Sequence, residues 1–161
     1  MMKCFGWNRI LVQAAFALGS LARGEGVNAN IVREANGQRV AVVGQMRIPV
    51  ESLPAGTKLY HWGSVEEMHR LARQGHVDAG EIDYLRNHAS GMAAGGGFYT
   101  SMNPFDSHGY GPALTVTELP REFFYITKGM VIADPKMLQA LANAGVSGIQ
   151  VAPTWFNVID S

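Results

Sequence analysis

The chain has 161 residues, of which 47% are hydrophobic and 16% charged, a composition that fits one globular domain and excludes a disordered segment. Thirteen basic and thirteen acidic residues cancel, and no basic run is long enough to form a nucleic-acid-binding surface. Nineteen glycines favour a strand-rich fold with many turns over a helix bundle.

Residues 1–22 have the parts of a secretory signal peptide: a basic start, an apolar run and small residues before Ala22. The run is too short to span a membrane. An ordinary N-terminal helix packed on the core stays open as the alternative, because Gln13 interrupts the apolar run. Cleavage after Ala22 would remove Cys4, the only cysteine, and place the protein outside the cell or in the periplasm. Without cleavage the protein would be cytoplasmic.

The first half of the chain alternates strand and turn signals. Residues 23–38 are polar and irregular and are predicted to be a leader, so that the folded domain begins at residue 39. The β-branched run 39–43 predicts a strand. Prolines within 48–56 predict a loop, and the apolar-aromatic run 58–62 predicts the next strand.

Two helices carry clear start and stop signals. Ser64 and Glu67 form the capping pattern that opens a helix, and Gly75 ends it. The second helix begins at Asp134 and Pro135. Residues 78–90 are compatible with either a short helix or a loop. The remaining strands are predicted at 98–101, 113–119, 122–127, 149–151 and 155–159, with an extension over 130–133. This order predicts an α+β fold rather than a doubly wound α/β sheet.

The stretch GGGFYTSMNPFDSHGYG at 95–111 holds two tyrosines, Tyr99 and Tyr110, that are eleven residues apart and close to glycines. With the segment Tyr-His-Trp-Gly-Ser at 60–64, it resembles the ADP-ribosyltransferases of the diphtheria-toxin type, a family that includes the poly(ADP-ribose) polymerases. That family has a Gly-aromatic-Tyr strand followed by a second tyrosine at this spacing. It opens its fold with Tyr-His-Gly-Thr, and here Trp62 is inserted before the glycine.

The resemblance implies a small, β-rich fold of mixed and antiparallel strands in two packed sheets with a few helices, and NAD as the substrate. It implies that Tyr99 and Tyr110 clamp the nicotinamide ring, since stacked rings contribute about 0.5–1.5 kcal/mol beyond the area they bury. His61 is implied to bond a ribose hydroxyl of the adenosine half. The other residues implied for binding NAD supply backbone or hydroxyl groups to the carboxamide and the riboses: Trp62, Gly63, Ser64, Thr100 and Ser107.

The implied reaction cleaves the bond between nicotinamide and ribose through an oxocarbenium-like transition state, which a carboxylate beside the ribose would stabilise. In the family this acid is a glutamate on a late strand. Its position here falls on Thr154 or Trp155, neither of which is acidic. Gln150 and Glu118 are predicted to substitute for the missing glutamate. Together with His61 and Tyr99 they are the residues predicted to act in catalysis.

Three functions stay open at this point. The first is a secreted mono-ADP-ribosylating toxin or effector that modifies a macromolecule, with protein favoured over nucleic acid. The second is a catalytically silent domain of the same fold that binds NAD, ADP-ribose or a protein. The third is an unrelated interaction domain whose tyrosines belong to the core. No cysteine or histidine pair has the spacing of zinc ligands, so no metal is expected.

Overall fold

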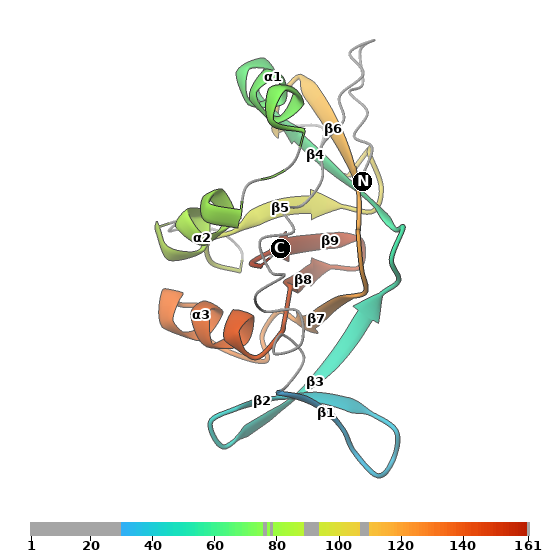
Figure 1. The fold of residues 1–161 in the computed structure, drawn as a ribbon, viewed down its shortest axis with the longest axis vertical. Helices are drawn as coiled ribbons and strands as arrows, with labels where there is room; N and C mark the ends of the chain where they lie inside the picture. Colours follow the sequence, from blue (N-terminus) through green and yellow to red (C-terminus); the bar gives the residue numbers. More distant parts are fainter. Residues whose placement is uncertain (1–29, 76, 78, 89–93, 107–109, 161) are drawn as a thin grey trace.

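The computed structural model describes residues 30–75, 77, 79–88, 94–106 and 110–160, which form a β-rich α+β domain (Figure 1). Residues 1–22, where a signal peptide is predicted, lie outside the described residues. In chain order the elements are β1 (Ile31–Arg33), β2 (Arg39–Val43), β3 (Met46–Leu53), β4 (Lys58–Gly63), α1 (Val65–Gln74), α2 (Ala79–His88), β5 (Phe98–Ser101), β6 (Ala113–Glu118), β7 (Phe123–Thr127), α3 (Pro135–Asn143), β8 (Gly148–Ala152) and β9 (Trp155–Val158).

The described strands form one continuous nine-stranded sheet in the order β1-β2-β3-β7-β8-β9-β5-β4-β6, instead of the two packed sheets that the resemblance implied. The strand β3 makes this continuity possible, because it pairs with β2 along most of its length and with β7 over residues 51–53. Neighbouring strands are antiparallel except β7 and β8, which are parallel and are connected through α3. The three helices lie along one side of the sheet (Figure 1).

Three segments differ from the sequence-based prediction. The strand β1 lies within the segment predicted to be a polar leader and pairs with β2, so the sheet begins before Arg39. The strand β3 runs through Pro49, where a loop was predicted. A proline is tolerated there because β3 pairs only with β2 at that residue, and its other edge has no described strand beside it until Glu51. Residues 130–133, predicted to extend a strand, form a turn and coil instead.

Helix α1 begins and ends as predicted. The Ser64 side chain accepts a hydrogen bond from the Glu67 amide at 3.0 Å, and Gly75 takes the left-handed conformation with a φ of 75°. The segment left open between helix and loop is α2. Its inward face includes Arg86, which is only 3% exposed and donates to the Ile159 carbonyl at 2.6 Å. A buried arginine interrupts the apolar periodicity by which a helix is recognised in a sequence.

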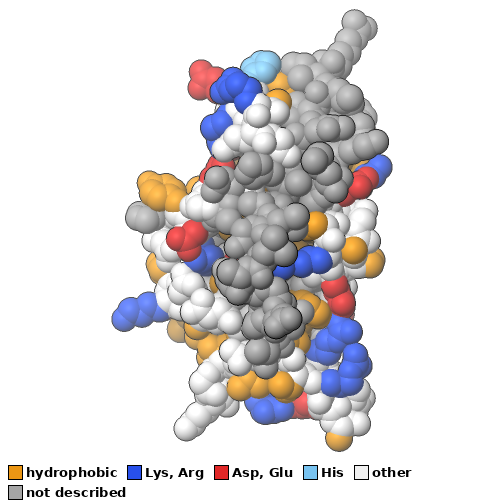
Figure 2. Space-filling view, viewed as in Figure 1, with side chains coloured by type: hydrophobic (Ala, Val, Ile, Leu, Met, Phe, Trp, Pro, Cys, Tyr) orange, Lys and Arg blue, Asp and Glu red, His pale blue; other side chains and the backbone are white. Residues whose placement is uncertain are grey.

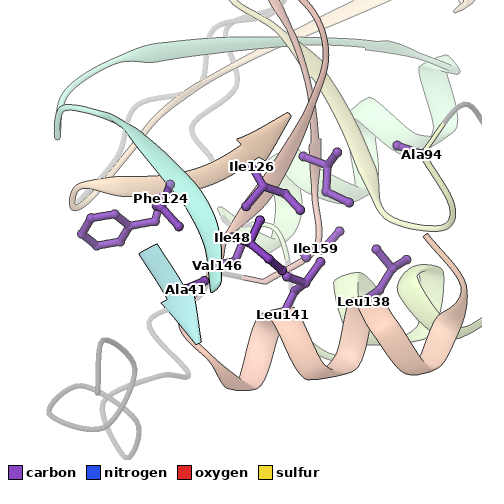
Figure 3. Close-up of a cluster of buried hydrophobic side chains, with 11 residues drawn as sticks. Ala41, Ile48, Ala94, Phe124, Ile126, Leu138, Leu141, Val146 and Ile159 are labelled. Carbon is purple, nitrogen blue, oxygen red and sulfur yellow. The ribbon is translucent and has the colours of Figure 1, made fainter. Parts of the chain in front are cut away.

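The core consists of two groups of buried apolar side chains that pack between the sheet and the helices. The group around Phe98, Phe123 and Phe156 lies under α1 and α2. The other lies under α3, where Leu138 and Leu141 point toward the sheet (Figure 3). Each of these leucines is fully buried, which contributes about 1.5–3 kcal/mol per side chain to folding.

Charged side chains of both signs are interspersed on the face shown in Figure 2. Two of the ion pairs hold the β1–β3 region: Arg39 with Glu122 and Arg47 with Glu34. No helix among the described residues is long and apolar enough to cross a membrane. The face shown in Figure 2 therefore carries a mixed charge. The strands β4 and β5, which carry His61 and Tyr99, meet at the pair of Tyr60 and Ser101.

Candidate functional site

A cavity of about 760 Å³ opens beside β4, β5 and β9 and is bordered by α1 and α2. Its volume lies in the range of small-molecule and cofactor sites. Of the eight residues predicted to bind NAD, seven line this cavity, and the eighth, Ser107, lies outside the described residues. The lining is mainly aromatic and small: His61, Trp62, Gly63, Ser64, Glu67, Leu85, Gly97, Phe98, Tyr99, Thr100, Tyr110, Val151 and Trp155.

The position of His61 follows from the way in which β4 and β5 diverge. These strands share a single pair in register, Tyr60 with Ser101, and the next residue of β4 is His61. Its Nδ1 lies 2.7 Å from the Tyr99 carbonyl oxygen, so this side-chain contact joins β4 to β5 beyond their single backbone pair. The imidazole also stacks on Phe98, with ring centroids 4.1 Å apart. These contacts fix the ring at the cavity wall.

The second nitrogen of the same imidazole is bound to Glu67. His61 Nε2 lies 2.6 Å from Glu67 Oε1, and the two side chains are 15% and 29% exposed. Burial alone would raise the pKa of the Glu67 carboxyl, but the His61 hydrogen bond and the positive charges of His61 and Arg70 hold it below its ordinary value. The carboxylate is therefore ionised at neutral pH.

Both partners of His61 are hydrogen-bond acceptors, namely a backbone carbonyl and a carboxylate. Both ring nitrogens therefore face acceptors, and each contact is a hydrogen bond where that nitrogen carries a proton. Gly63 is required beside this pair, because a Cβ atom there would lie 2.0 Å from Glu67 Oε1. Sequence reasoning identified Glu67 only as a capping residue. The sequence did carry a signal for the contact with His61, because Glu67 follows it by six residues and lies in the first turn of the next helix.

The two tyrosines of the motif border the same cavity in different ways. The Tyr99 hydroxyl donates to the Gly95 carbonyl at 2.7 Å and accepts from the Ala94 amide at 3.0 Å, which holds its ring in place. Burial raises the pKa of Tyr99. Tyr110 is 70% exposed, and its ring meets Trp155 edge to face at 5.9 Å. Tyr99 therefore forms part of the wall and Tyr110 part of the mouth.

A buried asparagine that the sequence did not indicate supports the glycine-rich segment before β5. Asn157 is fully buried, and its Nδ2 donates to the carbonyls of Ala94 and Gly96 at 3.1 and 3.0 Å. A Cβ atom on Gly97 would lie 1.9 Å from Asn157 Oδ1. The backbone can approach β9 this closely only because residue 97 is a glycine.

The inserted Trp62 has a structural role at the edge of the site. Its Nε1 donates to the Pro104 carbonyl at 2.5 Å, which attaches the segment after β5 to β4. Asp106 in the same segment accepts hydrogen bonds from Ser101 and Thr154. The cavity mouth is thus held by contacts among three separate parts of the chain.

Neither predicted substitute for the missing acid is among the residues that line the cavity, and their roles in catalysis stay a prediction. Glu118 lies at the end of β6 opposite Lys58, at the opposite end of β4 from Gly63. Gln150 donates to the Pro153 carbonyl, and the following residue, Val151, lines the cavity. A register shift between Gln150 and Ala152 interrupts the regular alternation of side chains at this point of β8.

At the position where the resemblance places a glutamate, Trp155 lines the cavity, and the Thr154 hydroxyl is bound to Asp106. Glu67 is the only acid among the described lining residues. No group of three metal-ligating side chains occurs in the part of the chain that the structure describes. Comparisons with protein-family models, with curated proteins and with solved structures found no match to this chain.

Proposed function

We propose that the chain is an NAD-dependent ADP-ribosyltransferase whose substrate binds in the cavity beside β4, β5 and β9. The observation that carries this proposal is that His61, Tyr99 and Tyr110, which come from three separate segments, line one cavity. The resemblance seen in the sequence assigns a role in NAD binding to each of these side chains. Their common location is what such a site requires.

The physical character of the cavity supports the same substrate. NAD presents flat aromatic rings and hydroxyl-rich riboses. Aromatic rings are available in the cavity lining from Tyr99 and from the contacting pair of Tyr110 and Trp155. Polar groups for the riboses are available from Ser64, Thr100 and the pair of His61 and Glu67. A mainly apolar cavity with a few placed polar groups is typical of cofactor sites.

In the proposed reaction the bond between nicotinamide and ribose breaks, and its electron pair leaves with nicotinamide, which becomes neutral. A nucleophile of the acceptor then bonds to the ribose carbon and gives up its proton. We propose a protein as the acceptor, because Tyr110 exposes an aromatic side chain at the cavity mouth, and aromatic side chains are enriched at protein interfaces. We also propose that the protein is released as a toxin or effector, which requires residues 1–22 to act as a signal peptide.

A second candidate function is a domain that binds NAD or ADP-ribose without turnover. The observation that favours it is that neither Thr154 nor Trp155, the two positions where the resemblance places the catalytic glutamate, is acidic. Both candidates require the same cavity, so they differ in chemistry and not in ligand.

The test is to incubate the protein with labelled NAD and a mixture of acceptor proteins, and to measure binding by calorimetry in parallel. Tyr110→Ala is expected to weaken NAD binding by about tenfold, because it removes one stacking ring from the mouth without opening the core. Tyr84→Ala is the matched control, since Tyr84 is an exposed tyrosine on α2 outside the cavity.

The outcomes separate the candidates. Label transfer or release of nicotinamide supports the transferase. Binding that depends on Tyr110 but gives neither product supports the silent domain. No NAD binding by the unaltered protein, or equal affinities of Tyr110→Ala and Tyr84→Ala, contradicts the cavity as an NAD site.

A further inference from the structure

We propose that Glu67 is the acidic residue with which the cavity recognises its ligand, and that its carboxylate accepts a hydrogen bond from a ribose hydroxyl. The inference rests on the proposed function, because it takes NAD as the ligand. It assigns a ligand-binding role to a residue of α1, whereas the sequence placed the acidic function on late strands. The chemical group that it requires of the ligand is a sugar hydroxyl that can donate a hydrogen bond.

The first step of the argument is that the carboxylate is held in one place. The backbone of Glu67 is fixed by the helix cap, where its amide donates to Ser64. A glutamate at this position of a capping box usually reaches back to the N-cap backbone. Here Oε1 lies instead 2.6 Å from His61 Nε2, inside the cavity lining. The absence of a side chain on Gly63 leaves the space that this arrangement needs.

The second step is that this arrangement leaves one acceptor for a ligand. Both ring nitrogens of His61 are already bonded to acceptors, so the imidazole has no nitrogen left for a hydroxyl. Among the described residues, none donates a hydrogen bond to the second carboxylate oxygen of Glu67. The side chain is 29% exposed and borders the cavity, so this oxygen is within reach of a bound molecule.

The third step concerns the chemistry of that oxygen. A fixed, ionised carboxylate in a mainly aromatic cavity favours a neutral hydroxyl donor, and hydrogen bonds from hydroxyls to carboxylates are short and strong. A ribose presents two adjacent hydroxyls, and NAD has two riboses. A purely structural Glu67, which only orients His61, would give the same contacts without a ligand. The ligand must therefore be varied in the test as well as the protein.

The experiment measures dissociation constants by calorimetry for the unaltered protein, Glu67→Gln and Glu67→Ala. The ligands are NAD and two NAD analogues, each lacking both hydroxyls on one of the two riboses. Glu66→Gln is the matched control, because Glu66 is the preceding residue in the same helical turn and lies outside the cavity. Melting temperatures show that each variant is folded, and Glu67→Gln alone is sufficient if Glu67→Ala does not fold.

We expect Glu67→Gln to weaken NAD binding by about tenfold or more and Glu66→Gln to leave it unchanged. For one of the two analogues this weakening should disappear, which identifies the ribose that Glu67 contacts. Equal NAD affinities for the unaltered protein and Glu67→Gln overturn the inference while leaving the proposed function intact. So does an equal weakening for NAD and both analogues, because Glu67 would then act only through His61. Failure of the unaltered protein to bind NAD overturns the proposed function, and this inference with it.

Discussion

The His61–Glu67 pair shows how one residue acquires two roles from its surroundings. Glu67 stabilises the start of α1 through its amide, and its carboxylate forms an ion pair in the cavity wall. A sequence pattern reveals the first role, because capping depends on a spacing of three residues. It does not reveal the second, because the contact with His61 depends on the angle at which α1 leaves β4.

This pair predicts a dependence of stability on pH. The pKa of Glu67 is held below its ordinary value of 4.5 in the folded protein, mainly by His61 and with a smaller effect of Arg70, against the opposing effect of burial. A depressed folded-state pKa gives stability that is complete above the unfolded-state pKa and is lost as the pH falls through the folded-state pKa. The free energy of unfolding should therefore differ between the unaltered protein and Glu67→Gln near neutral pH, and the difference should shrink in acid.

Urea unfolding followed between about pH 6 and about pH 3 measures this difference. Glu66→Gln serves as the control, since Glu66 is exposed and no described residue forms an ion pair with it. A difference between the unaltered protein and Glu67→Gln that stays constant over the whole pH range would contradict the ion pair.

At the scale of the elements, the helix caps allow stability and binding to be separated. Ser64 caps α1, and Asp134 caps α3 by accepting from the Met137 amide at 2.8 Å. Replacing either by alanine should lower the free energy of unfolding by about 1 kcal/mol. Only Ser64→Ala should also weaken NAD binding, because Ser64 lines the cavity and α1 carries Glu67, whereas α3 lies on the other core. Calorimetry and urea unfolding of both variants check this, and equal NAD affinities would show that the start of α1 does not position the site.

Most elements could be predicted because their signals are local. The caps of α1 and α3, the β-branched run of β2 and the aromatic run of β7 depend on neighbouring residues alone. The exceptions have causes elsewhere in the chain. Pro49 is accommodated by the lack of a second neighbour for β3 at that point, and the polar inward face of α2 follows from the contact of Arg86 with the C-terminal segment.

Part of the candidate site could also be predicted, because some of its residues carry local signals in the sequence. His61 and the two tyrosines stand out through spacing and resemblance, and the structure brings them to one cavity. Asn157 could not be found, since nothing adjacent to it marks the contact with Ala94 and Gly96. Gln150 is not among the residues that line the cavity, and the register shift beside it in the β8–β9 pair has no signal in the neighbouring sequence.

At the scale of the whole molecule, ligand binding should raise thermal stability. A ligand that binds only the folded state at about a hundred times its dissociation constant adds about 2.7 kcal/mol. For a domain of this size that corresponds to a rise of roughly 5–10 °C in melting temperature. We expect NAD to produce such a shift in the unaltered protein and a smaller one in Tyr110→Ala at the same concentration. Differential scanning calorimetry measures both, and an unchanged melting temperature at saturating NAD would contradict the site.

The single register pair between β4 and β5 has a consequence for how the two parts of the sheet move. Few backbone hydrogen bonds join β4 to β5. The contact between the His61 side chain and the Tyr99 carbonyl therefore contributes much of the connection between these strands. Deuterium uptake by backbone amides is then expected to be slow in β8 and β9 and faster where β4 meets β5. A molecule that contacts His61 on β4 and Tyr99 on β5 would join the two strands and slow deuterium uptake in both of them together.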